Sequence, residues 1–187
     1  MSEYLTYDFV NGSIITSFVI FRDKTHKLVY ATLGKDKTKL FRDARRDIEK
    51  LSKLTKTKYT LKHDDDSSKQ YKPELLEFKK LLDGELRSPQ CIRYEFLFGT
   101  PFQRKVWKEL VNVPFGETVS YKSIARRLGN AKMSRAVGGA CAQNRIGIIV
   151  PCHRIVGSSH KLTGFGWGLE LKRKLLENES IARDKDR

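Results

Sequence analysis

Cysteine is scarce in this 187-residue chain, and its placement excludes two common scaffolds. The three cysteines, Cys91, Cys141 and Cys152, leave one unpaired in any disulfide scheme, and they show neither C-x-x-C nor zinc-finger spacing. A disulfide framework and a zinc finger are therefore both excluded as the basis of the fold. This use of cysteine is typical of a reducing compartment.

Long hydrophobic runs are absent as well. Residues 1–10 contain acids and lack the basic flank and apolar segment of a secretory signal. No uninterrupted apolar stretch approaches the roughly 20 residues that span a membrane. With an ordinary hydrophobic content of 39%, the chain is expected to be soluble and intracellular, and it is long enough for one large or two small domains.

Acidic residues are few relative to basic ones. Lys and Arg number 37 against 22 Asp and Glu, which gives a net charge of +15. Residues 1–100 carry 20 basic and 15 acidic side chains, whereas residues 101–187 carry 17 and 7. Such an excess attracts polyanions, although a merely solvated basic surface, or nonspecific binding to membranes or RNA, is also compatible with charge alone.

Hydrophobic periodicity predicts both strands and helices in the first half of the chain. Runs rich in Ile, Val, Phe and Tyr favour strands, and apolar residues recurring from Leu40 to Leu54 favour an amphipathic helix. Lys62–Lys72 is polar and unpatterned, so it predicts an exposed loop. The other predicted elements are the strands Ile14–Phe21, Leu28–Leu33 and Ile92–Phe98 and a helix over Glu74–Asp83.

A domain boundary is predicted near Gly99-Thr100-Pro101, which gives domains 1–95 and 96–187. Beyond it, apolar spacing from Phe102 to Val111 predicts a helix, and Ser120 can cap the next one. A third helix, of small residues, is predicted near Met133–Gln143 after a short turn that contains glycine. This order is the outline of a helix-turn-helix.

Gly138 and Gly139 lie within that third predicted helix. Each glycine costs about 1 kcal/mol relative to alanine in a helix interior. Tolerating two suggests that something approaches the helix backbone closely, either a neighbouring strand or a nucleic-acid groove. Arg135 in the same helix is most simply a phosphate contact.

The segment Pro151-Cys152-His153-Arg154 follows the apolar run Ile146–Val150, which predicts a nucleophile at the end of a buried strand. The thiolate is the attacking species, and a neighbouring imidazole or cation lowers a cysteine pKa. The same residues are compatible with a buried, inert cysteine beside a histidine that points elsewhere, because neighbours in a strand face opposite sides.

Several segments of the second half occur together, in order and at fixed intervals. They are Phe102-Gln103-x-x-Val106-Trp107, Ser120-Tyr121, Arg135-Ala136-Val137-Gly138-Gly139-Ala140, Asn144 and Pro151-Cys152-His153-Arg154-Ile155. This pattern, over about residues 100–180, resembles the O6-alkylguanine-DNA alkyltransferases, or methylated-DNA–protein-cysteine methyltransferases. The resemblance implies an α+β fold, with a variable, ribonuclease H-like N-terminal α/β domain before a mainly helical, winged-helix-like helix-turn-helix domain.

The resemblance also implies direct-reversal DNA repair, in which an alkyl group moves from O6 of guanine, and less efficiently from O4 of thymine, to Cys152. His153 would act as the base through a bound water, and Glu179, in a helix from about Leu169, would orient it. Asn144 would hold the local turn together, and Tyr121 would donate a proton toward N3 of the base. The implied pocket residues are Pro151, Ile155, Phe165 and Gly166, the last standing where other members often carry serine.

The target atom is inaccessible in a stacked duplex, so the nucleotide must rotate out of it. The resemblance implies that Arg135 fills the vacated place while its helix enters the minor groove of double-stranded DNA. The implied DNA-binding residues are Tyr121, Lys122, Asn130, Arg135, Ala136, Gly138, Gly139 and Ser158.

The thioether product has no evident release route, so a single turnover per chain is expected, without metal or organic cofactor. Relatives with N-terminal zinc use Cys and His, but the first ninety residues here hold only His26 and His63 and no cysteine. A monomer is expected, in the nucleus or, if the source is a prokaryote, in the cytoplasm.

Three alternatives differ in the role of Cys152. A non-enzymatic damage-binding relative commonly replaces this nucleophile with tryptophan, whereas the cysteine is present here. A helix-turn-helix regulator would use it structurally, but the sequence has no obvious dimerisation segment. A Cys-His hydrolase would leave the DNA-binding features unexplained.

Overall fold

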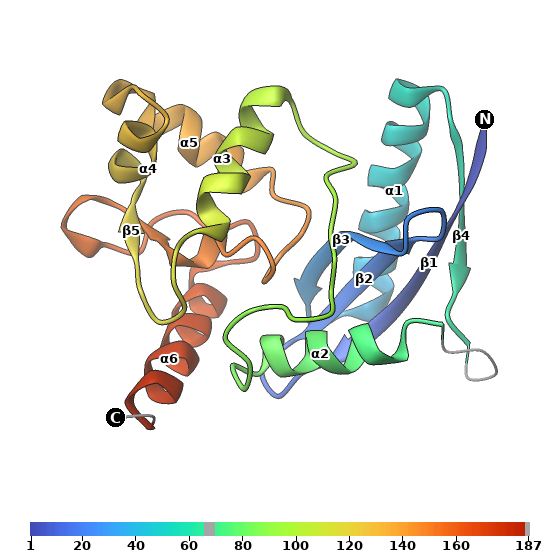
Figure 1. The fold of residues 1–187 in the computed structure, drawn as a ribbon, viewed down its shortest axis with the longest axis horizontal. Helices are drawn as coiled ribbons and strands as arrows, with labels where there is room; N and C mark the ends of the chain where they lie inside the picture. Colours follow the sequence, from blue (N-terminus) through green and yellow to red (C-terminus); the bar gives the residue numbers. More distant parts are fainter. Residues whose placement is uncertain (66–69, 186–187) are drawn as a thin grey trace. The chain divides into compact units, whose positions relative to one another are not determined.

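The computed structural model describes residues 1–65 and 70–185 and has a mixed α+β fold (Figure 1). Backbone contacts divide the chain into two compact units, Met1–Phe98 and Gly99–Arg187. Asp66, Ser67, Ser68 and Lys69 of the predicted exposed loop lie outside the described residues. In the described ranges, no helix is long and apolar enough to cross a membrane.

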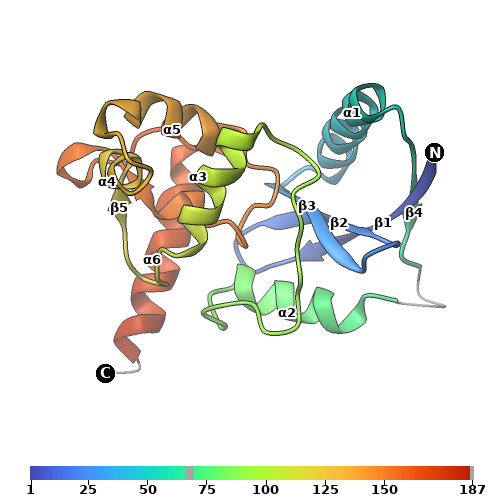
Figure 2. The same ribbon diagram turned by 45° about the horizontal axis from the view of Figure 1, so that its top comes forward.

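The first unit is built on a four-stranded sheet of order β3-β2-β1-β4. β1, β2 and β3 pair antiparallel, and β4 returns parallel to β1 after the crossover helix α1. Helices α1 and α2 lie on opposite faces of this sheet (Figure 2). The bounds are β1 (Ser2–Asn11), β2 (Thr16–Arg22), β3 (Lys27–Gly34), α1 (Lys37–Thr55), β4 (Lys58–His63) and α2 (Lys72–Leu82).

Successive side chains of β2 point to opposite faces of the sheet, so this strand contributes apolar residues to both. Phe18 and Ile20 join the core cluster that includes Leu40 of α1, whereas Phe21 stacks on Tyr71, just before α2, with ring centroids 4.3 Å apart. Removing these apolar side chains from water is the main favourable term in folding.

The predicted strands at β2 and β3 and the predicted helices at α1 and α2 are confirmed. The prediction that Leu54 belongs to the apolar face of α1 is wrong. Leu54 is 83% exposed, because the helix ends at Thr55 and its last turn runs past the sheet-facing residue Leu51. The predicted exposed loop is also partly wrong, since Asp64 is buried and accepts hydrogen bonds from the backbone N–H groups of Gln70 and Tyr71.

The predicted strand Ile92–Phe98 is wrong. Only one bridge forms there, between Tyr94 and Leu28. At the start of this segment, the carboxylate of Glu77 accepts hydrogen bonds from three successive backbone amides, those of residues 90–92, at 2.8–3.0 Å. Within the predicted strand, Glu77 occupies the Ile92 amide alone; Leu28 then exchanges backbone hydrogen bonds with Arg93 and Glu95, and the rest of the segment is irregular.

The second unit is mainly helical. Trp107 links two of its helices, because its indole Nε1 donates to the carbonyl of Ala140 at 2.8 Å. Two residue pairs, β5 (Val119–Ser120) and β6 (Ile155–Val156), form a small parallel sheet. The helices are α3 (Pro101–Val111), α4 (Tyr121–Arg127), α5 (Ser134–Ala142) and α6 (Leu169–Lys185), with 3₁₀ turns η1 (Ala131–Met133), η2 (Cys152–Arg154) and η3 (Ser158–His160).

The predicted pair of helices around a glycine-containing turn is confirmed as α4 and α5. The Ser120 side chain accepts from the backbone N–H of Ser123 and so caps α4. Gly129 then takes a φ of 95°, which side chains disfavour, and the Asn130 side chain caps η1. The chain thus turns sharply and presents α5 as a separate short helix.

The predicted buried strand Ile146–Val150 is wrong. The residues are largely buried but form turns, in which the backbone N–H of Val150 donates to the carbonyl of Ile146. The side chain of Asn144 satisfies polar groups at both ends, with Oδ1 accepting from Ile146 and Nδ2 donating to the carbonyl of Val150. Burial without a sheet is possible because these polar groups are paired locally.

Candidate active site

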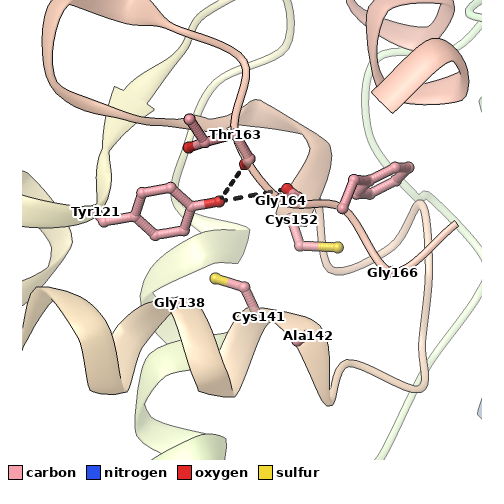
Figure 3. Close-up of a pocket in the computed structure, with 9 residues that line it drawn as sticks. Tyr121, Gly138, Cys141, Ala142, Cys152, Thr163, Gly164 and Gly166 are labelled. Carbon is pink, nitrogen blue, oxygen red and sulfur yellow. Dashed lines mark hydrogen bonds between the residues drawn. The ribbon is translucent and has the colours of Figure 1, made fainter. Parts of the chain in front are cut away.

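A pocket of about 380 Å³ lies between α5 and the loop that precedes α6 (Figure 3). In Figure 3 the sulfur atoms of Cys141 and Cys152 both project toward the space between the helix and this loop. The lining residues are Tyr121, Gly138, Cys141, Ala142, Cys152, Thr163, Gly164, Phe165 and Gly166.

Two residues expected to line this pocket do not do so. Pro151 precedes η2 and is buried, and Ile155 is fully buried where β6 pairs with Val119. The expected strand would have continued past the thiol, whereas the 3₁₀ turn η2 redirects the chain, so that Cys152 alone of this segment reaches the pocket. Phe165 and Gly166, also expected there, do line it.

The thiol of Cys152 is almost fully buried and is held by one side-chain donor. Its exposed fraction is 5%, and Nδ2 of Asn144 donates to Sγ at 3.2 Å. The same amide closes the preceding turn at Ile146 and Val150. Asn144 therefore fixes the position of the sulfur and the path of the chain that leads to it.

The thiol is protonated at neutral pH. Burial raises the pKa of Cys152 to about 11, against the opposing effects of the Asn144 hydrogen bond and the positive charge of Lys172. The expectation that the adjacent imidazole lowers this pKa is wrong, because Nε2 of His153 lies 2.6 Å from Oε1 of Glu179. The thiolate, which is the attacking species, is therefore a minor form of Cys152 at neutral pH in this arrangement.

His153, Arg154 and Glu179 form a buried network behind the thiol. Arg154 donates to both carboxylate oxygens of Glu179 at 3.0–3.2 Å and to the carbonyl of Val113 at 2.7 Å, and Gly116 N–H completes the set at 3.0 Å. Burial raises the pKa of Glu179, but the hydrogen bonds from His153 and Arg154, together with the charge of Arg154, outweigh it and bring the value to about 2. The carboxylate stays ionised, and it fixes the orientation of the His153 ring.

Tyr121 forms one wall of the pocket, at the start of α4. Its hydroxyl donates to the carbonyl of Thr163 at 2.9 Å and lies 3.4 Å from that of Gly164 (Figure 3). Burial raises the pKa of Tyr121, so the hydroxyl remains a proton donor at neutral pH.

The exposed face of α5 carries Arg135, Ala136 and Gly139, while Gly138 lines the pocket. A Cβ at Gly139 would meet no described atom within 4 Å, and one at Gly138 would meet only the Tyr121 ring, at 3.8 Å. Of the two explanations for these glycines, close approach by a neighbouring strand is therefore excluded for the described residues. Approach by a molecule from outside remains.

The other residues expected to contact DNA are exposed on the same unit. Lys122 lies in α4, Asn130 caps η1 through a 2.9 Å hydrogen bond from Lys132 N–H, and Ser158 begins η3. Asn130 thus has a structural task that the sequence pattern did not indicate. Within residues 1–65 and 70–185, no three His, Cys, Asp or Glu side chains gather as a metal site would require.

Sequence reasoning missed two pocket-side groups. Cys141 is one of only three cysteines, yet nothing in its sequence context sets it apart. Lys172 lies in a helix rich in basic residues and is nevertheless fully buried. Its position between Leu171 and Leu175, both buried, was the available signal, because it places the lysine near the inner stripe of the helix.

Comparison with known proteins agrees with this site. Residues 101–181 match the family model described as 6-O-methylguanine DNA methyltransferase, DNA binding domain. The chain is 43% identical over 180 residues to the methylated-DNA–protein-cysteine methyltransferase of Saccharomyces cerevisiae, covering 96% of this chain and 95% of that one.

Solved structures extend the similarity to the fold. The O6-methylguanine methyltransferase of Mycobacterium tuberculosis superimposes with a TM-score of 0.71 at 30% identity, covering 95% of this chain and 94% of that one. For Mycobacterium tuberculosis OGT in complex with DNA, the TM-score is 0.68 at 29% identity, covering 96% and 94%. Fold and site define a two-unit α+β protein with a buried cysteine at a pocket within the part of the chain that matches a DNA-binding domain. The chain belongs to the methylated-DNA–protein-cysteine methyltransferase family.

Proposed function

We propose that this protein repairs alkylated DNA by moving a methyl or other alkyl group from O6 of guanine to Sγ of Cys152. The observation that carries the proposal is a pocket in which a buried thiol shares the wall with Tyr121 and the Gly164–Gly166 loop. The sulfur–carbon bond forms as the carbon–O6 bond breaks. The thiol loses one proton and the guanine ends with one proton in place of the alkyl group, so no external co-reactant is needed.

Proton transfer is proposed to run through His153. Because Nε2 faces Glu179 at 2.6 Å, Nδ1 is the nitrogen left to take the thiol proton, by way of a bound water. The ionised Glu179 stabilises the imidazolium that results, as in other activated nucleophiles. Tyr121, protonated at neutral pH, donates toward N3 of the departing base as that base gains negative charge.

DNA is proposed to bind along α5. The exposed Ala136 and Gly139 leave the helix backbone accessible to a narrow minor groove, and Arg135 occupies the space that the flipped nucleotide vacates. Lys122, Asn130 and Ser158 would contact the strand. Readout in the minor groove is degenerate, which suits a protein that must find damage in any sequence.

The remaining features of the proposal concern scope and form. We propose lower activity on O4-alkylthymine, one reaction per chain, a monomer and a nuclear location. The first unit is proposed to be ribonuclease H-like, which its sheet order β3-β2-β1-β4 with parallel β1 and β4 supports. The second is proposed to be winged-helix-like, on the basis of α4, α5 and the small β5–β6 sheet.

The test uses duplex DNA with a single O6-methylguanine and the intact mass of the protein. The proposal requires a gain of one CH2 per chain, located on the peptide that contains Cys152. Cys152→Ala should gain nothing and still bind the duplex. Binding of the lesion without any mass gain would favour the damage-binding alternative, and repeated release of repaired DNA would contradict the single turnover.

Base flipping has its own measurement. Arg135→Ala should slow repair of the duplex far more than reaction with free O6-benzylguanine, because the free base needs no unstacking. Lys132→Ala, also in the turn before α5, is the matched control for loss of one positive charge. Equal losses on duplex and free base would remove the flipping role from Arg135.

A further inference from the structure

Helix α1 of the first unit presents a row of basic side chains to solvent. One face of the helix is apolar and buried against the sheet (Figure 2). At about 3.6 residues per turn, five basic positions fall on the opposite face, and all five side chains are exposed. We call this row the α1 stripe, and its members are Lys39, Arg42, Arg46, Lys50 and Lys53.

The spacing of the α1 stripe works against the stability of its own helix. Each member lies three or four residues from the next, which places like charges side by side on the helix surface. Such pairs destabilise a helix. Lys39 also lies in the first turn, where the helix dipole disfavours a cation and where no acidic residue is present. The arrangement of these charges therefore does not serve the folding of α1.

The acidic residues of α1 neutralise little of this charge. Asp43 pairs with one member of the stripe, Arg46, at 3.2 Å. Glu49 pairs instead with Arg45, outside the stripe, at 3.2 Å, and Asp47 accepts from a tyrosine hydroxyl of β3 at 3.1 Å. Among residues 1–65 and 70–185, the other four cations of the stripe have no carboxylate partner. The stripe is therefore a surface whose counter-charge has to come from another molecule.

The shape of the α1 stripe fits the backbone of a nucleic acid. From Lys39 to Lys53 it extends about 21 Å, at a rise of about 1.5 Å per residue. One strand of a DNA duplex carries a phosphate about every 3.4 Å along the axis, so the stripe is as long as about six phosphates of one strand. Lys and Arg contacts to phosphates position a protein on DNA without reading its sequence.

We propose that the α1 stripe is a second DNA-binding surface, which contacts the phosphates of duplex DNA independently of α5. The inference rests on the proposed function, since duplex DNA is the proposed substrate. It gives the first unit a task of its own, which is to raise the affinity for any duplex, damaged or intact. Recognition of the lesion stays with the second unit.

The test measures how binding to an undamaged duplex depends on salt concentration, by fluorescence anisotropy. Each phosphate contact adds about 0.9 to the slope of log affinity against log salt. A double variant, Arg42→Gln with Lys53→Gln, removes two contacts, so its slope should be shallower by about 1.8 and its affinity at about 0.1 M salt at least about tenfold weaker.

The matched control is Lys72→Gln with Lys80→Gln. It removes two exposed lysines of α2, on the opposite face of the same sheet, and so changes the net charge by the same amount (Figure 2). This control should keep the wild-type slope. An unchanged slope in the stripe variant would overturn the proposal, and so would an equal change in both variants, which marks net charge acting without a defined surface.

Vesicles of phosphatidylserine and phosphatidylcholine test the other anionic surface. A stripe variant that loses binding to these vesicles but not to the duplex would assign the stripe to a membrane and overturn the proposal. If Arg42→Gln lowers the temperature of unfolding, Lys39→Gln with Lys53→Gln carries the same comparison. The duplex contains no lesion, so a failure of the proposed repair function would be visible separately, as absence of the CH2 gain.

Discussion

Each unit of this protein buries one glutamate, and the two carboxylates are neutralised in different ways. Glu77 in α2 is 9% exposed and accepts from three successive backbone amides, those of residues 90–92. Glu179 in α6 is 6% exposed and accepts from the side chains of His153 and Arg154 as well as from Gly116 N–H. The same group fixes a loop in one unit and organises side chains in the other.

The difference teaches where function is concentrated. Glu77 interacts with backbone amides and with the thiol of Cys91, and burial and Glu77 raise the pKa of that thiol to about 11. None of these donors loses its proton at neutral pH, so the Glu77 arrangement holds the chain in place. The Glu179 arrangement includes an imidazole that can take up a proton, one residue from the thiol. Glu179, beside an imidazole next to the thiol, can therefore influence a reaction, whereas Glu77, whose donors keep their protons at neutral pH, influences stability.

Glu179→Gln should produce the largest effect. Alkyl transfer should fall by about 100-fold or more, because the imidazolium loses its stabilising charge, and unfolding should become easier by about 3–5 kcal/mol, because Arg154 is left buried without a carboxylate. Single-turnover kinetics and urea unfolding measure the two losses. A variant with the wild-type transfer rate would place the proton relay elsewhere.

Lowering the pH should remove the stabilising contribution of the Glu179 carboxylate in the wild-type chain. The pKa of Glu179, about 2 in the folded protein, lies below its ordinary value of 4.5, so its stabilising contribution is complete above pH 4.5 and is lost as pH falls toward 2. The free energy of unfolding should therefore drop over this range more steeply in the wild type than in Glu179→Gln. Parallel curves for the two proteins would show that the carboxylate is not charged as described.

Glu77→Gln should cost about 1.5–3 kcal/mol of stability, the range for hydrogen bonds to a charged group. The alkyl-transfer rate of the folded fraction should stay unchanged. Thermal unfolding and single-turnover kinetics at a temperature well below the transition separate the two quantities. A fall in rate comparable with that of Glu179→Gln would break the contrast between the units.

Gly139→Ala should give the smallest effect. It should raise the stability of the protein and lower its rate of duplex repair. Alanine should stabilise α5 by up to about 1 kcal/mol, because a Cβ there meets no described atom. Repair of a duplex should slow, since the added methyl lies on the exposed helix face proposed to enter the groove. Free O6-benzylguanine should react at the wild-type rate, and an unchanged duplex rate would remove Gly139 from the DNA contact.

Periodic elements of this fold were predictable from sequence, and elements that depend on distant partners were not. The apolar spacing of α1 and the Ser120 cap of α4 are local signals, and both are borne out. Strand β4 has few apolar residues, and pairing with β1, more than fifty residues away in sequence, makes it a strand. Ile92–Phe98 has strand-like composition but pairs with β3 at a single bridge, between Tyr94 and Leu28.

The site divides in the same way. The residue pattern placed Cys152 beside a histidine, and the family resemblance paired His153 with Glu179, which agrees with the 2.6 Å contact, but neither could show that burial raises the pKa of the thiol. The position of the thiol depends on the 3₁₀ turn η2, and a run of Ile and Val followed by proline does not predict such a turn. The position of Lys172 between Leu171 and Leu175 places it near the inner stripe of α6, but the burial of its charge depends on carbonyls of the opposite pocket wall, which the sequence does not show.

Ile148 has a strained backbone conformation in the loop that leads to Cys152. Its φ of 72° is unfavourable for a β-branched residue by about 1–2 kcal/mol, and it lies in the loop that Asn144 closes before Cys152. A turnover enzyme meets such a cost once and then reacts many times. If each molecule reacts a single time, folding and reaction occur in equal numbers, and every repaired base is matched by one loop folded into this strained form.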